Sequence, residues 1–478
     1  MKKFLTLSLM VFALVAQAKV YTLPQLAELV PAMEDGTGVA VLEDGSYVVN
    51  LPASLPEGTT GIGYDDNNIV LSKNYFTING DLQINEGEVL LFGGKTSMEI
   101  NGNLSATGAT FGAAEGSEEQ AKGFRLYMEG TSVTITNCTF NYVGITYGNG
   151  TEEGCLTITD CTFNNHNSKS ANAAINFTSL SKGNLVENCV FENPALSAVG
   201  SGANVACGII FKNNTVNKPA ASTRLYPGIN LSATGPYDII VEGNDVHGPA
   251  EITRAGGIAL ACLLGNPPTG TLYVRDNFVE NCSYGITLTG PGYVVMEGNT
   301  VLNNKYIADP NQGGSGLNIT CNSSGEGIIA KAYMKGNHIE GNVWGVTVIG
   351  NVDINAGKLN RDDEDYNPGE NVFIDNGNGD PYVQYDWYNN TTATSYAQGN
   401  IWSVEVQDEE HIAQVIVDKA DNEMLGEVIY MPAGGSNTAI TDVKSDVKQI
   451  SGRYNLLGQP VDANYRGIVI ENGKKVVK

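Results

Sequence analysis

The chain has 478 residues and a formal net charge of −25, although only 17% of its residues are charged. This negative field disfavours nucleic acid and anionic lipid as partners. It also disfavours anionic polysaccharide, unless a divalent cation mediates the contact.

Residues 1–18 are predicted to be a secretory signal peptide. Lys2 and Lys3 precede an apolar run over residues 4–15, and Ala16-Gln17-Ala18 provides a small-residue cleavage site. No later segment has 18 consecutive apolar residues, so we expect no transmembrane helix once the signal is removed. The mature chain is therefore expected to be secreted or held at the cell surface.

Residues 19–78 are expected to form an N-terminal cap and the first irregular rungs of a larger structure. Thr22 and Gln25 have the spacing of a helix capping box. The apolar residues that follow, Leu26, Leu29 and Val30, predict a short helix. Such a helix would cover an open strand edge, which otherwise invites aggregation.

A four-residue motif organises residues 79–432. Asn137-Cys138-Thr139-Phe140 recurs seven times in related form, with spacings of 22 to 38 residues. Its second position is occupied by Cys138, Cys161, Cys189, Asn214, Asn244, Asn277, Asn299 and Asn337. Apolar residues recur three and five residues before this position and two residues after it, which predicts a half-buried strand, a bend and a second strand. A loose period of this length is typical of a solenoid.

These repeats predict an all-β, single-stranded right-handed parallel β-helix with short helical end caps. Stacked asparagines at the bend could join their side-chain amides from coil to coil. The repeats resemble those of the pectate-lyase-like β-helix superfamily over roughly residues 80–390. The catalytic signatures of that superfamily are not found in this sequence, so the resemblance implies the fold and not the activity.

Candidate catalytic residues are Asp245, His247 and Arg254. With Val246 turned inward, Asp245 and His247 should face outward, where an acid–base pair could act on a bound sugar. The alternative is that they are ordinary surface residues of a turn.

Two further groups of candidate residues lie on or near the coils. Tyr284 and Trp344 precede the glycines that open strands, so they could stack on sugar rings or pack under neighbouring loops. Oxygen-rich side chains in one loop suit calcium, although the spacing is not that of an EF-hand and a solvated acidic loop is the alternative. These are Asp362, Asp363, Glu364 and Asp365.

The end of the chain is predicted to leave the β-helix. Residues 408–419 should form a covering helix and residues 426–432 a final strand. Residues 433–440 have the composition of a flexible linker.

Residues 441–478 combine a Leu457-Gly458-Gln459 turn, a Gly467–Ile470 strand and an Asn472-Gly473 hairpin with a basic end. This order is similar to the C-terminal sorting domains of type IX secretion, and the resemblance implies export to the outer surface of a Gram-negative bacterium through that machinery. The alternative is an ordinary small β module.

The expected function is a non-catalytic surface scaffold for adhesion or contact with an extracellular glycan. The alternative is a polysaccharide lyase or glycoside hydrolase.

Two structural predictions concern the cysteines and the charged residues of the coils. The eight cysteines should be mainly free, buried thiols. The residues two before the motif position alternate in charge and should form an external ladder that fixes the register of six coils: Glu187, Lys212, Glu242, Arg275, Glu297 and Lys335.

Overall fold

The structure, a computed structural model, describes the chain in two units, one ending at Gly435 and one within residues 436–478. The described residues are 19–127, 129–167, 173–201, 206–219, 226–249, 255–262, 267–307, 313–323, 325–377 and 385–435, together with three strands of the second unit. No helix among these residues is long and apolar enough to cross a membrane.

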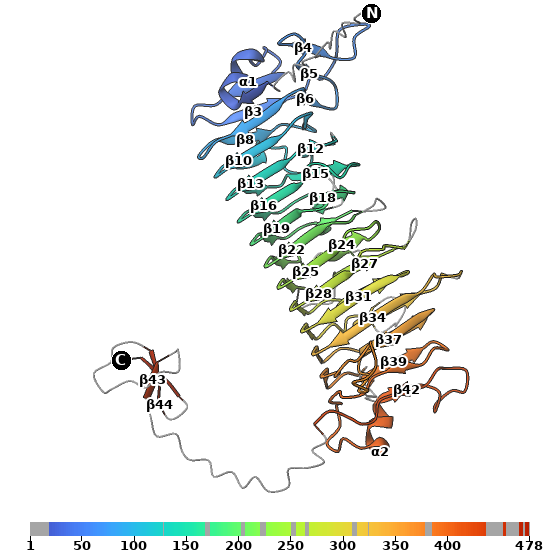
Figure 1. Ribbon diagram of the computed structural model, residues 1–478. Helices are drawn as coiled ribbons and strands as arrows, with labels where there is room; N and C mark the ends of the chain where they lie inside the picture. The colour runs from blue at the N-terminus through green and yellow to red at the C-terminus, as the bar shows by residue number, and fades with distance from the viewer. Residues whose placement is uncertain are drawn as a thin grey trace, which may run out of the picture. The chain divides into compact units, whose positions relative to one another are not determined.

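The first unit is a stack of coils, each of which contributes one strand to each of three sheets, named A, B and C (Figure 1). Sheet A contains β1 (Val20–Thr22), β7 (Asp81–Ile84), β10 (Leu104–Thr107), β13 (Val133–Thr136), β16 (Leu156–Thr159), β19 (Asn184–Glu187), β22 (Ile209–Lys212), β25 (Ile239–Glu242), β28 (Leu272–Arg275), β31 (Gly292–Glu297), β34 (Ala330–Lys335), β37 (Val352–Asn355), β40 (Ser395–Tyr396) and β42 (Val428–Ile429).

Sheet B contains β2 (Gly38–Val41), β3 (Tyr47–Asn50), β8 (Val89–Phe92), β11 (Thr110–Ala113), β14 (Thr139–Asn141), β17 (Thr162–Asn164), β20 (Val190–Glu192), β23 (Thr215–Asn217), β26 (Asp245–His247), β29 (Phe278–Glu280), β32 (Thr300–Leu302), β35 (His338–Glu340) and β38 (Val372–Ile374).

Sheet C contains β4 (Ile62–Tyr64), β5 (Ile69–Leu71), β6 (Phe76–Ile78), β9 (Ser97–Ile100), β12 (Gly123–Leu126), β15 (Gly144–Asn149), β18 (Ala173–Ser179), β21 (Ser197–Gly200), β24 (Pro227–Ser232), β27 (Gly256–Ala261), β30 (Ile286–Thr289), β33 (Ser315–Cys321), β36 (Trp344–Gly350), β39 (Trp387–Asn390) and β41 (Ile416–Val417). Pairing within the three sheets is parallel except at the N-terminal end, where β2–β3 and β4–β5–β6 are antiparallel. The predicted parallel β-helix is therefore confirmed.

The backbone of the bend between sheets A and B explains the repeated motif. The residue before the inward-facing position has a positive φ, between +53° and +66°, in all eight copies of the motif. Only glycine adopts this left-handed conformation freely, and asparagine and aspartate tolerate it. The motif therefore begins with Asn, Asp or Gly and continues with a residue that points into the core.

The predicted asparagine column is confirmed as a hydrogen-bonded ladder. Each side-chain amide donates to the Oδ1 of the next coil at 2.8–3.0 Å, through Asn214, Asn244, Asn277, Asn299, Asn337, Asn371 and Asn400. A second ladder, which the sequence reading missed, lies at the bend between sheets B and C. It joins Asn304, Asn342 and Asn376 and ends on the carboxylate of Asp386, with distances of 3.1 Å.

Cysteine replaces asparagine at the motif position in the earlier coils. Cys138, Cys161 and Cys189 are buried at the motif position, and all eight cysteines are free, as predicted. The hydrogen bond with Cys138 lowers the pKa of Cys161, but the hydrogen bond with Cys189 and burial outweigh it and raise this pKa to about 12. Phe140 and Phe163 stack beside this column with ring centroids 4.4 Å apart.

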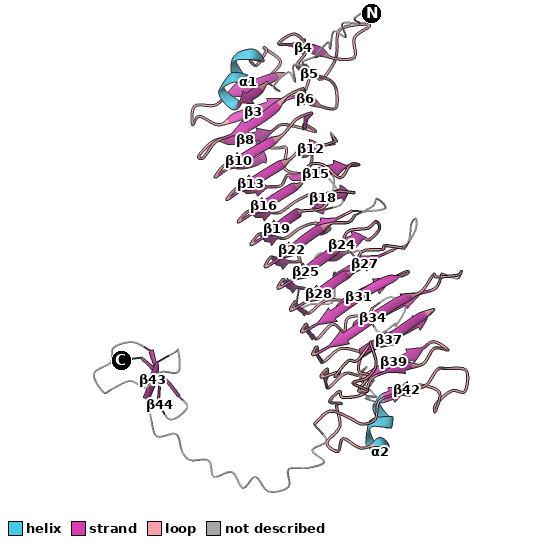
Figure 2. Cartoon of the chain, viewed as in Figure 1, coloured by secondary structure: helices cyan, strands magenta, loops and turns pink. Residues whose placement is uncertain are grey.

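Both ends of the β-helix are covered (Figure 2). At the N-terminal end α1 (Leu23–Leu29) buries Leu23 and Leu26, and the backbone N–H of Thr22 donates to Gln25 Oε1 at 3.0 Å, as the capping box predicts. At the other end the predicted helix over 408–419 is shorter than expected: α2 spans Glu409–Ile412, followed by a 3-10 turn over Ala413–Val415. Residues 416–417 instead pair with β39, because the open edge of sheet C needs a backbone partner. The predicted final strand is confirmed as β42.

The second unit contains a three-stranded antiparallel sheet of β43 (Arg453–Asn455), β44 (Ile468–Glu471) and β45 (Lys474–Val477). Glu471 pairs with Lys474, so a two-residue connection joins the last two strands, as a hairpin at Asn472-Gly473 requires. Both turn residues lie outside the described residues.

Candidate functional site

The lengths of the connections single out sheet C. From β10 through β35 every connection from sheet A to sheet B has two residues. Connections into sheet C reach eight residues between β17 and β18, and twelve between β32 and β33; those that leave it reach ten between β27 and β28. Long loops on a rigid scaffold are where binding residues concentrate. The acidic loop is the exception, because it lies in the connection of 16 residues between β37 and β38, from sheet A to sheet B. The other long loops of the coils lie along the two edges of sheet C.

The outer face of sheet C carries a column of uncharged side chains. Successive outward residues, in register on nine consecutive coils, are Thr146, Asn176, Gly200, Asn230, Ala259, Thr287, Asn318, Thr347 and Tyr388. We call this set the neutral column. At a strand spacing of about 4.8 Å it extends for about 38 Å. Six of the nine residues are half-buried, whereas Gly200, Ala259 and Thr347 are buried. In a chain with a net charge of −25, a column of this length without a formal charge is distinctive.

The neutral column is rich in hydrogen-bonding groups that are held in place. The hydroxyls of Thr287 and Thr320 both donate to Asn318 Oδ1, at 2.8 and 2.9 Å, which fixes the orientation of that amide. Asn176 Oδ1 and the neighbouring Thr178 Oγ1 are buried and have no hydrogen-bond partner among the described residues. Both atoms are closed off from solvent, so they are not open to a ligand at the surface of the column.

Both predicted stacking residues lie at the edge of sheet C where strands enter it. Trp344 is only 5% exposed, and its ring lies against the backbone of Gly314. Tyr284 is half-buried, and its ring lies over Gly256. The two rings are thus packed on the backbone of the preceding coil. Trp344 is therefore closed to solvent, whereas Tyr284 keeps part of its side chain exposed.

The predicted catalytic residues lie on a different sheet. Val246 is fully buried, while Asp245 and His247 face outward from β26, as the alternation requires. His247 Nδ1 lies 2.9 Å from Glu280 Oε1 on the next coil, so its nearest charged group is not Asp245. Arg254 lies outside the described residues. The grouping of an acid, a histidine and an arginine is thus not assembled by the described part of the chain.

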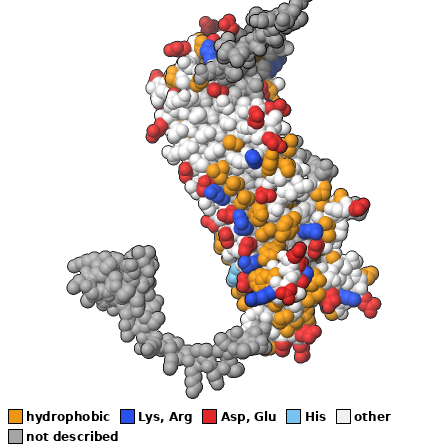
Figure 3. All heavy atoms as spheres, viewed as in Figure 1, with side chains coloured by type: hydrophobic (Ala, Val, Ile, Leu, Met, Phe, Trp, Pro, Cys, Tyr) orange, Lys and Arg blue, Asp and Glu red, His pale blue; other side chains and the backbone are white. Residues whose placement is uncertain are grey.

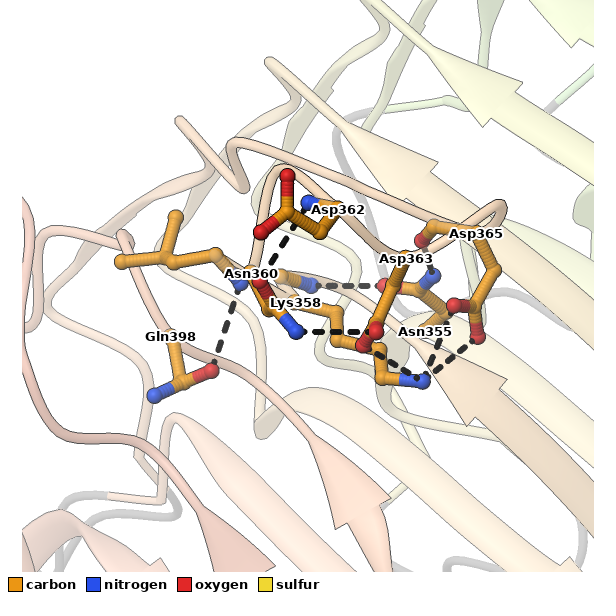
Figure 4. Close-up of polar contacts among 9 residues, drawn as sticks. Asn355, Lys358, Asn360, Asp362, Asp363, Asp365 and Gln398 are labelled. Atoms are coloured by element: carbon orange, nitrogen blue, oxygen red, sulfur yellow. Dashed lines mark hydrogen bonds and ion pairs between the residues drawn. The ribbon is translucent and has the colours of Figure 1, made fainter.

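The acidic loop is organised around a lysine instead of a cation site (Figure 4). Lys358 Nζ lies 2.9 Å from Asp365 Oδ1 and 3.3 Å from Asp363 Oδ2. Asn360 donates to Asp363 Oδ1 at 2.9 Å, and the backbone N–H of Asp362 donates back to Asn360. No group of three or more acidic, histidine or cysteine side chains is placed to hold a metal among the described residues.

This loop is also remote from the predicted catalytic pair. It precedes β38, four strands along sheet B from β26, which corresponds to about 19 Å. The prediction of calcium at Asp362, Asp363, Glu364 and Asp365 did not include Lys358, whose ammonium forms ion pairs with Asp363 and Asp365.

Several ionisable residues lie inside the bend between sheets B and C, where sequence reasoning did not look. His166, Lys218 and Cys282 are all at most 5% exposed. Burial lowers the pKa of Lys218 to about 8 and that of His166 to about 3, and it raises the pKa of Cys282 to about 12. The Lys218 ammonium donates to the carbonyl of Leu196. These groups point into the core, so they bear on stability and not on a surface site.

Comparison with known proteins adds little to this picture. No family model matches the chain, and no curated protein matches it. A double mutant of the periplasmic alginate epimerase AlgG is similar at 12% identity with a TM-score of 0.36, over 87% of this chain and 84% of that one. The A-module of Azotobacter vinelandii mannuronan C-5 epimerase AlgE6 is similar at 10% identity with a TM-score of 0.19, over 75% and 89%. Such likeness concerns the fold alone, and the β-helix rests here on the strand pairing of the chain itself.

Proposed function

We propose that the mature protein is an exported, non-catalytic β-helix that binds a neutral extracellular polysaccharide along the outer face of sheet C. The observation that carries this proposal is the neutral column, about 38 Å of amide, hydroxyl and small side chains on a strongly acidic molecule. Amides and hydroxyls match the hydroxyl groups of a glycan as donors and acceptors. An anionic polymer would meet no positive charge along this column and would be repelled by the rest of the protein.

The alternative is a lyase or glycoside hydrolase. A lyase needs a base together with a cation or arginine that stabilises the charge developing beside the uronate carboxylate. His247 lies next to Glu280 on sheet B, and Asp365 of the acidic loop forms an ion pair with Lys358. Both groups lie away from the neutral column, which favours binding without cleavage.

The proposal is tested by affinity electrophoresis against a panel of neutral and uronate-containing polysaccharides, with product analysis after long incubation. We expect retardation by at least one neutral polysaccharide, weaker or no retardation by uronate polymers, and no new reducing ends or unsaturated products. Binding restricted to uronate polymers, or the release of fragments, would contradict it.

Export forms a second part of the proposal. Residues 1–18 act as the signal peptide, and residues 441–478 act as a type IX sorting domain that contacts the secretion machinery of a Gram-negative cell. It is supported by the sequence resemblance described above, and the three strands of the tail are compatible with it. In a type IX-competent host, removal of residues 441–478 should abolish surface delivery while leaving the melting temperature of the β-helix within about 2 °C. Undiminished delivery of the truncated protein would refute this role.

A further inference from the structure

The outer face of sheet A carries two columns of side chains that differ from those of sheet C. The first, which we call the apolar stripe, comprises Leu185, Ile210, Ile240, Tyr273, Val295 and Tyr333, which are neighbours in register. The second is the charge ladder: Glu187, Lys212, Glu242, Arg275, Glu297 and Lys335, each two residues further along the same strand. Figure 3 shows hydrophobic side chains gathered over the lower part of this face, with charged side chains beside them.

The ladder has the outward orientation that the sequence predicts, and its members are paired. Lys212 Nζ lies 2.9 Å from Glu187 Oε1, and Arg275 Nη2 lies 2.7 Å from Glu242 Oε2. Lys335 Nζ lies 3.1 Å from Glu297 Oε1. The ladder is therefore three adjacent ion pairs with no net charge.

The two columns begin and end on the same six strands, β19 to β34. On the preceding coils the stripe position is held by Ser105, Thr134 and Thr157, and on the following coil by Asn355. Beside the stripe Tyr293 is 42% exposed. The six stripe residues themselves are half-buried. Single apolar residues at a surface are common, whereas a contiguous row of partly exposed ones is typical of an interaction surface. Because the row and the ladder coincide, we treat them as one surface.

We propose that this surface is the interface of an antiparallel homodimer. The two-fold axis of this dimer lies in the interface, parallel to the strands and between β25 and β28. Rotation about it reverses the order of the coils in the partner subunit. The stripe then faces the partner's stripe, and the ladder faces the partner's ladder. Glu187 then faces Lys335 of the partner subunit, Lys212 faces the partner's Glu297, and Glu242 faces the partner's Arg275. An alternating ladder of six charges is thus self-complementary in this arrangement, as an isologous interface requires.

The same operation places stripe on stripe. Ile240 meets the partner's Tyr273, and Ile210 meets the partner's Val295, so apolar side chains cover one another and leave water together. A two-fold axis along the solenoid would instead place each charge of the ladder opposite its own copy, if it lies over the ladder, or the stripe of one copy over the ladder of the other, if it lies midway between the columns. That arrangement would remove charges from water against apolar groups, which is unfavourable. The antiparallel arrangement is the one that both columns favour.

The charges of this face are compatible with a second copy. Each chain has a net charge of −25, so most surfaces of two copies repel one another. At physiological salt the repulsion between distant charges is screened beyond about 8 Å. The charges within the contact then determine whether two copies attract or repel each other. The ladder contributes three positive and three negative charges from each copy.

The size of the surface predicts a weak dimer. Six coils at about 4.8 Å span about 29 Å, and a width of about 15 Å gives on the order of 900 Å² over both copies, near the lower limit for specific interfaces. A micromolar or weaker dissociation constant is expected in solution. Such an interface would matter most where many copies are concentrated on one surface.

Sedimentation velocity of the mature chain, from about 1 to 500 µM, tests the first part of the inference. We expect a reversible monomer–dimer equilibrium that Ile240→Lys shifts to monomer. Thr215→Lys, an outward residue of β23 on sheet B, is the matched control and should leave the equilibrium unchanged. A monomer at every concentration overturns the proposal, as does equal weakening by both variants. Loss of glycan binding in Ile240→Lys without any dimer in the wild type would assign the stripe to a glycan instead.

A charge cycle tests the antiparallel arrangement. Lys212→Glu alone, or Glu297→Lys alone, places like charges opposite each other twice in the dimer and should weaken it at least tenfold. The double variant restores opposite charges across the two-fold axis, although it worsens the contacts within each chain. It should dimerise within about threefold of the wild type while its melting temperature falls. A double variant that dimerises more weakly than either single variant refutes the arrangement, and circular dichroism verifies that each variant is folded.

Discussion

Replacement of Asn277 by alanine in the middle of the first ladder should destabilise the coils on one side of it. Asn277 is 1% exposed, and its side chain makes four hydrogen bonds. Its amide donates to the carbonyl of Val241 at 2.9 Å and to Asn299 Oδ1 at 3.0 Å. Its Oδ1 accepts from the backbone N–H of Asn244 at 3.0 Å and from the side chain of Asn244 at 2.9 Å.

Asn277→Ala leaves two donors of Asn244 and the carbonyl of Val241 without these partners in a closed core. Each buried group left unpaired costs about 1–3 kcal/mol, and neighbouring groups relax in part, so we expect a loss of about 2–5 kcal/mol. Asn277→Cys should lose less, because Cys161 Sγ already accepts the backbone N–H of Cys138 at this position of an earlier coil.

Hydrogen exchange gives the readout, because unfolding of a solenoid need not be all-or-none. A peptide that covers residues 239–246 should exchange at least tenfold faster in Asn277→Ala than in the wild type. A peptide from the distant coil at residues 133–140 should be unchanged and serves as the internal control. Unchanged exchange at residues 239–246, or a loss of stability below about 0.5 kcal/mol, would refute the view that the ladder holds the coils together.

Three further predictions concern single features of the core and the surface. Lys218→Met should raise the free energy of unfolding by about 1–3 kcal/mol near pH 7, because the folded-state pKa of Lys218, about 8, lies below the usual 10.5. The cost of burying the charged lysine is fully present below pH 8. The stabilisation measured by chemical denaturation should therefore shrink as the pH rises from 8 to 10.5. Arg275→Glu should lower the melting temperature at low salt by an amount equivalent to about 1–2 kcal/mol, because it removes the ion pair with Glu242 and leaves three adjacent acidic residues. An equal loss of stability in 1 M salt would argue against an electrostatic cause. Titration of the unfolded, unreduced mature protein should reveal eight reactive thiols, and four or fewer would contradict the free thiols of the core.

The fold could be predicted because the bend between sheets A and B imposes two demands on adjacent residues. One must tolerate a positive φ and the next must fit the core, so Asn137-Cys138 and its later copies stand out from the background. The same pair of demands operates at the second bend, in Asn303-Asn304, Gly341-Asn342 and Asp375-Asn376. That ladder is harder to predict because it lies in connections that vary from three to twelve residues and because earlier coils place His166 or Cys282 in its column.

The functional surfaces were harder to predict because they depend on which residues the coils bring together. The carboxylates of the acidic loop predict a cation site, whereas the lysine that pairs with two of them, Lys358, lies seven residues before Asp365 in the sequence. The apolar stripe does have a sequence signal, since each member stands four residues before the motif position. The neutral column has a weaker signal, because loops of variable length separate Thr287, Asn318 and Thr347 from any fixed register.

The measurement that tests the proposed function most directly is the affinity of two aspartate variants for the neutral polysaccharide that the wild type binds best. Thr287→Asp places a charge in the middle of the neutral column, and Thr300→Asp places the same charge at an outward, half-buried threonine of sheet B. We predict that titration calorimetry shows at least a tenfold loss of affinity for Thr287→Asp and less than a twofold change for Thr300→Asp. Equal affinities for the two variants would contradict binding along sheet C.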